Sequence, residues 1–307
     1  MNLLEKLKKI ESNNKAKKYL NWTGTLLSII GVIFIFFKLK DYSSQIDLSR
    51  LTISSWYAFV GLSFFYGCYS LLLAPLAWTN LLAYFGVSVP LYWSIRTYGI
   101  SQLAKYVPGN IFHFASRQAI GVSEGLPSIP LAKSTIWDIL LQAISAIFFG
   151  ILILPSFLPN FNEKIAFVVF ICTIFLYVYI IAHYWNVKIG YAASLYTISL
   201  ILSSVLFIAI LYILLPISVF NNLPILSIFG AYVVAWLVGM VTPGAPGGAG
   251  VKELILYTLM HSWISQSDLL LAIIISRIIT ILGDCVFYGI SVILNKILPS
   301  EKFIIPK

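Results

Sequence analysis

The residues best suited to chemistry lie in a polar stretch between two apolar regions, VTPGAPGGAGVKEL at 241–254. Its prolines and glycines rule out a continuous helix, because proline lacks a backbone N–H and glycine is costly to order. The positions concerned are Pro243, Gly244, Pro246, Gly247, Gly248 and Gly250. A helix that restarts at about Val251 would carry Lys252 and Glu253 in its first turn. Free N–H groups, a glycine-rich turn and a cation would then converge, which predicts a binding site for an anion.

A second stretch of the same character lies at 102–117, QLAKYVPGNIFHFASR. Pro108, followed by a glycine, interrupts an apolar region, and we expect a new helix after it with Asn110 as its N-cap. Arg117 is nine residues after Pro108, and Lys252 is equally far after the first proline of the other stretch. This parallel suggests an internal duplication of the kind that transporters show, and chance is an equal alternative.

Ionisable side chains in the apolar segments are the next candidates. A charge at bilayer depth costs on the order of 3 kcal/mol, so such residues normally face the interior of a bundle and are paired. Helical spacing places them on three faces. These faces hold Asp138, Gln142 and Ser145; Arg277, Thr280, Asp284 and Tyr288; and Asn110, His113 and Arg117, the last set beside Lys105.

The charged residues on these faces need partners. Arg277 and Asp284 are about two turns apart on one helix, too far for a direct salt bridge. Candidate pairs are Asp138 with Arg117 and Glu253 with Arg277, and the sequence does not choose between these pairings. Asp138, Glu253 and Asp284 are also candidates for proton coupling. For Asp138 and Asp284, a purely structural role between helices is an equal alternative.

The elements that must position these residues are membrane helices. The chain has 307 residues, of which 60% are apolar and 10% charged, and this composition predicts a polytopic membrane protein. We expect an all-α bundle of about eight transmembrane helices, with broken or re-entrant helices near 100–117 and 242–253 and a pair of half-helices within 90–123. The expected spans are 20–37, 51–74 with a bent continuation to 86, 131–154, 165–182, 191–215, 226–241, a short one at 251–263, and 269–294.

Basic residues predict the orientation. Residues 1–19 contain six lysines and should form a basic amphipathic segment on the cytoplasmic face. Residues 20–296 form a single membrane domain, and 297–307 form a short cytoplasmic tail. Both termini are therefore expected in the cytoplasm.

Several classes of function are disfavoured. The net charge of +9 comes mainly from segments beside apolar runs, so nucleic acid is not an expected partner. Cysteines 68, 172 and 285 lie singly, and histidines 113, 183 and 261 are scattered without an HExxH pattern. We therefore expect no disulfide, no metal site and no cofactor.

Together the two stretches resemble the signature regions of the lysylphosphatidylglycerol synthase transmembrane-region family, which includes the membrane half of the multiple peptide resistance factor. The matching residues are Lys105, Pro108, Gly109 and Asn110 in the first motif and Pro246, Gly247, Gly248, Gly250, Lys252 and Glu253 in the second. Many relatives have arginine in place of Lys252, and lysine keeps the charge but loses the bidentate fork. The resemblance covers nearly the whole chain in length and in the order of its spans.

The resemblance implies movement of lipids between leaflets, in the cytoplasmic membrane of a bacterium or archaeon. The full-length synthase carries a soluble aminoacyl-transferring domain after its membrane half. The present sequence ends at Lys307 without one, so synthesis of lysyl lipid is not expected.

The main hypothesis is therefore a flippase-like translocase rather than an enzyme. Expected substrates are an anionic phospholipid or a polyprenyl phosphate-linked glycan. The expected headgroup ligands are Lys105, Asn110, His113, Arg117, Lys252 and Arg277. The alternatives are a membrane glycosyltransferase or other enzyme acting on a polyprenyl phosphate, and an accessory subunit of a lipid or glycan synthase.

Overall fold

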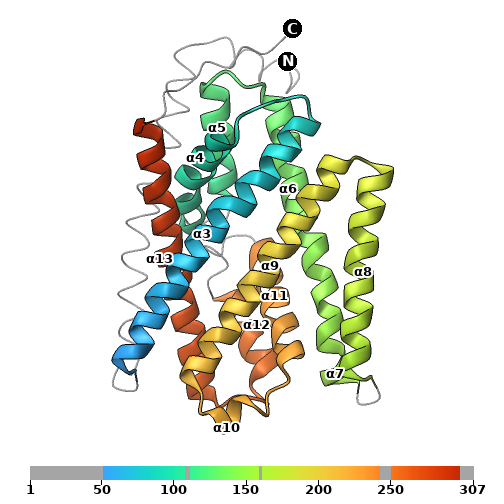
Figure 1. The fold of residues 1–307 in the computed structure, drawn as a ribbon, viewed down its shortest axis with the longest axis vertical. Coiled ribbons are helices and arrows are strands. Elements are labelled where there is room, and N and C mark those ends of the chain that lie inside the picture. Colours follow the sequence, from blue (N-terminus) through green and yellow to red (C-terminus); the bar gives the residue numbers. More distant parts are fainter. Residues whose placement is uncertain (1–50, 108–110, 159–160, 243–249, 298–307) are drawn as a thin grey trace.

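The computed structural model describes residues 51–107, 111–158, 161–242 and 250–297, and every regular element in these ranges is a helix (Figure 1). The predicted cytoplasmic segment 1–19, the first span 20–37 and the tail beyond residue 297 lie outside the described residues. So do most of the residues predicted to break the two helices, namely Pro108, Gly109, Asn110, Pro243, Gly244, Pro246, Gly247 and Gly248.

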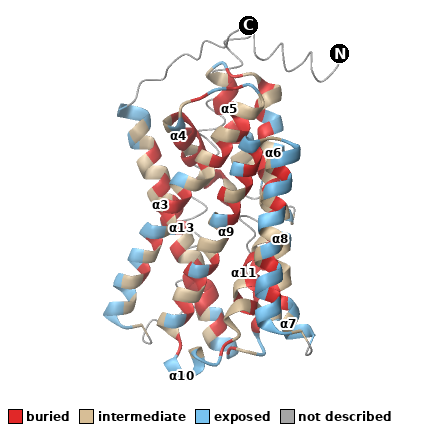
Figure 2. Cartoon of the chain, turned by 45° about the vertical axis from the view of Figure 1, so that its right-hand side comes forward, coloured by how far each residue is buried: buried red, intermediate tan, exposed pale blue. Residues whose placement is uncertain are grey.

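Five of the described helices are long and apolar enough to cross a membrane. They are α3 (Ile53–Tyr84), α6 (Ser128–Phe148) with its continuation through η3 (Phe149–Ile153) and α7 (Leu154–Phe157), α8 (Glu163–Tyr184), α9 (Val187–Leu214) and α13 (Gln266–Ile297). Large apolar side chains on α8, such as Phe167, Phe175 and Leu176, are exposed (Figure 2). An exposed apolar helix surface is expected where lipid replaces water as the solvent, so the predicted membrane class is confirmed.

The bounds of the long helices agree with the predicted spans to within a few residues, with two differences. Residues 51–86 were expected as a span and a bent continuation, and they form one helix, α3, with Pro75 inside it. The connection between the spans predicted at 165–182 and 191–215 is shorter than expected, because α8 continues to Tyr184 and α9 begins at Val187. Asn186 caps that helix, and its side-chain oxygen accepts a hydrogen bond of 2.9 Å from the backbone N–H of Lys188.

Residues 91–123 form a hairpin of half-helices, as predicted. It consists of α4 (Leu91–Gln102), η2 (Leu103–Tyr106) and α5 (Phe112–Ser123), and we call it the first hairpin. A salt bridge of 2.5 Å between Arg96 and Glu124 joins its two arms at the open end. Helix α5 begins at Phe112, directly after Ile111. The predicted N-cap, Asn110, lies outside the described residues.

A second hairpin consists of α11 (Ile225–Val241) and α12 (Val251–Met260), and α10 (Ile217–Phe220) precedes it. The last short helix, predicted as a crossing, is not among the described helices that are long enough to span a membrane. Ten residues rise about 15 Å, half of the roughly 30 Å of a bilayer core. Ile228 near the start of α11 and Met260 at the end of α12 belong to one buried cluster, so α12 returns to the end at which α11 begins.

The two hairpins enter the bundle from opposite ends. In Figure 1, α4 and α5 occupy the upper half of the molecule, and α11 and α12 occupy the lower half. Each hairpin is followed in the chain by a long helix that runs the full height, α6 after the first and α13 after the second. The tips of both hairpins therefore point toward the middle of the bundle.

Helices α3 and α13 cross in close contact beside this middle region. Gly67 and Gly283 allow the contact, because a Cβ atom added to Gly67 would lie 2.9 Å from the carbonyl oxygen of Gly283. A Cβ atom on Gly283 would lie 2.7 Å from the carbonyl oxygen of Ser63. Small residues at helix crossings are a regular feature of membrane bundles, because they let backbones approach each other.

Candidate headgroup-binding site

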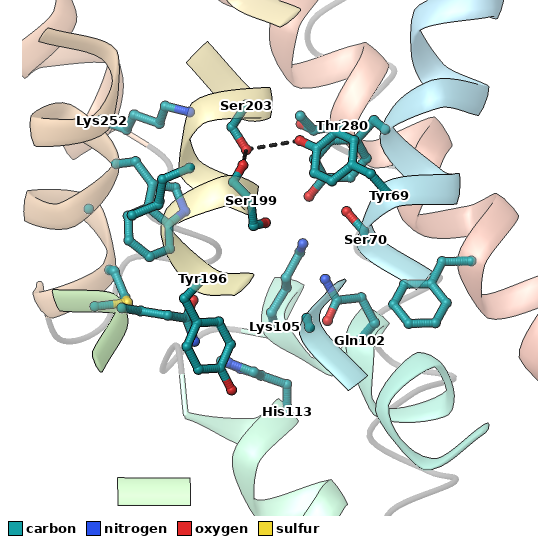
Figure 3. Close-up of a pocket in the computed structure, with 18 of the residues that line it drawn as sticks. Tyr69, Ser70, Gln102, Lys105, His113, Tyr196, Ser199, Ser203, Lys252 and Thr280 are labelled. Atoms are coloured by element: carbon teal, nitrogen blue, oxygen red, sulfur yellow. Dashed lines mark hydrogen bonds between the residues drawn. The ribbon is translucent and has the colours of Figure 1, made fainter. Parts of the chain in front are cut away.

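A cavity of about 190 Å³ lies between the two hairpins (Figure 3). Both hairpins and the four long helices α3, α6, α9 and α13 contribute residues to its lining. Its volume is below the roughly 300–1,000 Å³ of sites that enclose drug-sized ligands. The cavity is therefore suited to a small polar group.

Lys105 lies at the tip of the first hairpin and lines the cavity. Its ammonium is 2.6 Å from a carboxylate oxygen of Asp284 on α13. Asp284 is fully buried and also accepts hydrogen bonds from Gln102 and from the hydroxyl of Tyr106. The expectation that Asp284 pairs with a residue outside its own helix is confirmed. The identity of that partner was not predicted.

Lys252 lies in the first turn of α12, at the tip of the second hairpin, and its side chain points into the cavity (Figure 3). It is 7% exposed, and its ammonium lies 3.8 Å from the ring centre of Tyr232 on α11. No carboxylate among the described residues forms an ion pair with it. The sequence singled out this residue, and the structure makes it a buried lysine amine without a carboxylate partner in the described part of the chain.

Glu253 holds the start of α12 in place. One carboxylate oxygen accepts a bond of 2.6 Å from the backbone N–H of Gly250, and the other is 2.5 Å from the guanidinium of Arg277 on α13. Gly250 has a φ of 86°, a conformation that side chains disfavour, which explains the glycine at this turn. The candidate pair of Glu253 with Arg277 is confirmed, and Arg277 also lines the cavity.

Arg117 forms the other candidate pair, with Asp138 at 2.8 Å. Both residues are fully buried. The guanidinium also lies over the ring of Tyr98, 4.1 Å from its centre, with Phe114 and Trp78 nearby. Neither Arg117 nor Asp138 is among the residues that line the cavity, so Arg117 lies behind the site and does not face a ligand in this arrangement.

His113 is another of the six predicted headgroup ligands. It lines the cavity from α5, and its buried Nδ1 has no hydrogen-bond partner among the described residues. Four of the six predicted headgroup residues thus surround one cavity, although they come from four separate elements: Lys105, His113, Lys252 and Arg277. Arg117 lies behind it, and Asn110 is outside the described residues.

Sequence reasoning missed the hydroxyl groups of the site. Tyr66 and Ser70 on α3 and Ser199 and Ser203 on α9 line the cavity, and the hydroxyls of Tyr69 and Ser203 lie 2.9 Å apart across it (Figure 3). Their spacing of four residues within apolar helices was the available signal, because it puts both polar groups of each pair on one face. That signal is weak, since isolated serines in a membrane helix can bond to their own backbone.

The carboxylates near the site are all engaged, and none of them lines it. Asp138, Glu253 and Asp284 each form an ion pair, and none is among the lining residues. Within the described ranges, no group of three or more His, Cys, Asp or Glu side chains is placed to hold a metal ion. Four basic residues and three carboxylates at and around the cavity leave an excess of one positive charge in the described part of the chain.

No protein-family model matches the chain, and neither a curated protein nor a solved structure similar to it was found.

Proposed function

We propose that this chain is an integral membrane lipid translocase that holds the phosphate-bearing headgroup of a lipid or polyprenyl-linked glycan in the cavity between its hairpins. The observation that carries the proposal is Lys252, a buried cation at the cavity with no ion-pair partner among the described residues. A buried charge is costly unless it is paired, and a bound phosphate would supply the missing partner. The resemblance to the lysylphosphatidylglycerol synthase transmembrane-region family points to the same class of ligand.

The arrangement of the hairpins supports a transport role over a purely structural one. Re-entrant segments that enter from opposite ends and meet near the middle are typical of transporters, whose sites lie where two such segments approach. Each hairpin tip carries a lysine that lines the cavity, Lys105 in the first and Lys252 in the second. A small tilt of either hairpin could open the cavity toward its own end of the bundle.

We propose six crossings in place of eight, formed by the predicted span 20–37 and the five long helices, with the two hairpins re-entrant. This count keeps both termini on the same side of the membrane, because six is an even number. A re-entrant hairpin returns the chain to the side from which it entered, as two crossings do. The end of the bundle that carries Lys133, Lys188 and Lys296 would face the cytoplasm, since basic residues concentrate there. The described part of the opposite end has Lys164, with Glu163 and Asp268 beside the helix starts.

The test is transbilayer movement of lipids in liposomes that contain only this protein. Fluorescent phosphatidylglycerol and a fluorescent polyprenyl phosphate monosaccharide would each be placed in both leaflets, and the fraction that a membrane-impermeant quencher reaches would be followed in time. We expect movement in the wild type and a rate lower by about ten- to a hundredfold in Lys252→Gln, because one charge-assisted hydrogen bond is worth about 1.5–3 kcal/mol. Lys133→Gln, which removes an exposed lysine near the start of α6, is the matched control.

Two outcomes would overturn the proposal. If the folded wild type moved neither lipid, the enzyme and accessory-subunit alternatives would replace it. If Lys252→Gln moved lipid as fast as the wild type, translocation would stand but the site would not be this cavity.

A further inference from the structure

We infer that the ligand of the cavity is a phosphodiester with a single negative charge and an uncharged, hydroxyl-bearing headgroup, and that lipids with a cationic aminoacyl headgroup are excluded. The inference rests on the proposed function for its location and goes beyond it in the class of substrate. It differs from what the family resemblance alone implies, since the best-known member of that family moves an aminoacylated lipid.

The charges that line the cavity are all basic. Lys105, Lys252 and Arg277 contribute side chains to the lining, and no aspartate or glutamate in the described ranges does so. The ammonium of a lysyl headgroup would lose its water here and find no carboxylate to replace it. The repulsion from Lys252 would add to that cost, so a cationic headgroup is disfavoured twice.

The number of unpaired charges sets the charge of the ligand. Lys105 and Arg277 already face Asp284 and Glu253 at 2.6 and 2.5 Å, so among the described lining residues only Lys252 calls for an additional anion. A phosphodiester carries one negative charge and would balance it. A phosphomonoester carries up to two and would leave an uncompensated charge, unless it displaced one of the existing carboxylates.

The remaining lining groups suit neutral hydroxyl groups. Serine, threonine and tyrosine hydroxyls and two side-chain amides surround the cavity, and each can both donate and accept hydrogen bonds. These hydroxyl and amide groups include those of Ser70, Ser199, Ser203, Thr280, Gln102 and Gln142. Glycerol and sugars present several hydroxyls that can pair with such groups. The choline of a zwitterionic lipid presents none.

Two sources of this chemistry are distinguishable by experiment. Phosphatidylglycerol carries a glycerol headgroup on a diacyl lipid, and a polyprenyl phosphate monosaccharide carries a sugar on a single long chain. Liposomes with the wild-type protein would receive fluorescent forms of each of these, of phosphatidylcholine and of lysylphosphatidylglycerol. We expect at least one of the two monoanionic lipids to move ten times faster than both phosphatidylcholine and lysylphosphatidylglycerol.

A binding measurement separates this inference from the proposed function. Short-chain versions of the same lipids would be added to the protein in detergent, and the thermal unfolding midpoint recorded. The monoanionic lipids should raise the midpoint, and the choline and lysyl lipids should not. Lys252→Arg should keep this preference, and Lys252→Gln should lose it.

The two measurements together separate the substrate inference from translocation. Selective stabilisation without any movement would uphold the inference and overturn translocation. Equal movement or equal stabilisation by lysylphosphatidylglycerol and phosphatidylglycerol would overturn the inference while leaving translocation intact.

Discussion

Arg277 and Asp284 lie two turns apart on α13, carry opposite charges, and pair with the tips of different hairpins. Arg277 holds Glu253 of the second hairpin at 2.5 Å, and Asp284 holds Lys105 of the first at 2.6 Å. Because their separation along the helix is about 10 Å, they cannot neutralise each other directly. Helix α13 is thus the common support to which both hairpin tips are fastened.

Removing Asp284 should therefore loosen the first hairpin. In Asp284→Ala, Lys105, Gln102 and Tyr106 lose their shared acceptor, and breaking a buried pair costs about 3–5 kcal/mol. We expect a clearly lower thermal unfolding midpoint in detergent. The double variant Lys105→Met, Asp284→Leu should recover part of the loss, because no charge is left alone. A double variant as unstable as the single one would show that the pair is not the source of the effect.

Arg117 should be a structural residue, although its position after a Pro-Gly break suggested a ligand. It is buried against Asp138 and three aromatic rings, and it does not line the cavity. Arg117→Met should destabilise the protein strongly, because Asp138 would remain as an uncompensated buried charge. Arg117→Met combined with Asp138→Leu should regain stability and retain lipid movement. Loss of movement in a stable double variant would return Arg117 to the list of headgroup ligands.

The sequence was most informative where a local rule dominates. Apolar runs predicted the long helices, and Pro-Gly pairs predicted the two breaks, because both signals depend on a few neighbouring residues. The start of α12 at Val251 was also predicted from the local sequence, whereas the positive φ of Gly250 was not. The crossing predicted at 251–263 is not confirmed, because α12 ends at Met260 and no local signal in the sequence marks that end.

Tertiary partners were less predictable. The pairs of Arg117 with Asp138 and of Glu253 with Arg277 were among the candidates, since a buried charge needs a partner of opposite sign. The partner of Asp284 was missed, because Lys105 is 179 positions away and reaches it only through the first hairpin. The hydroxyl-rich wall formed by α3 and α9 has only a weak local signature, and the packing of these helices brings Tyr69 to Ser203.

The crossing of α3 and α13 should be sensitive to a single methyl group. In Gly283→Ala, the new Cβ atom would lie 2.4 Å from the ring of Tyr66, which lines the cavity, and 2.7 Å from the backbone of Ser63. Overpacking of this kind costs about 1–3 kcal/mol. We expect a lower unfolding midpoint and slower lipid movement. Gly289→Ala is the matched control on the same helix, since its Cβ would meet no atom within 4 Å. Equal effects of the two substitutions would contradict the close contact.

The opposite entry of the two hairpins predicts a specific pattern of labelling. Single cysteines would replace Ser88 and Lys188 at one end of the bundle and Asn222 and Ser262 at the other, all in a variant without the native cysteines. In sealed vesicles of known orientation, a membrane-impermeant thiol reagent should reach the first two from the cytoplasmic side only. It should reach the other two from the opposite side only.

The same experiment tests whether α11 and α12 form a re-entrant hairpin. Leu254 lies one turn into α12 and is 62% exposed on the outer surface of the bundle, so a cysteine there should face lipid and resist the reagent from both sides. If α11 and α12 crossed the membrane separately, position 254 would lie close to the cytoplasmic surface and would be labelled from that side. Rapid labelling of Leu254→Cys from the cytoplasm would therefore restore eight crossings and remove the second hairpin from the site.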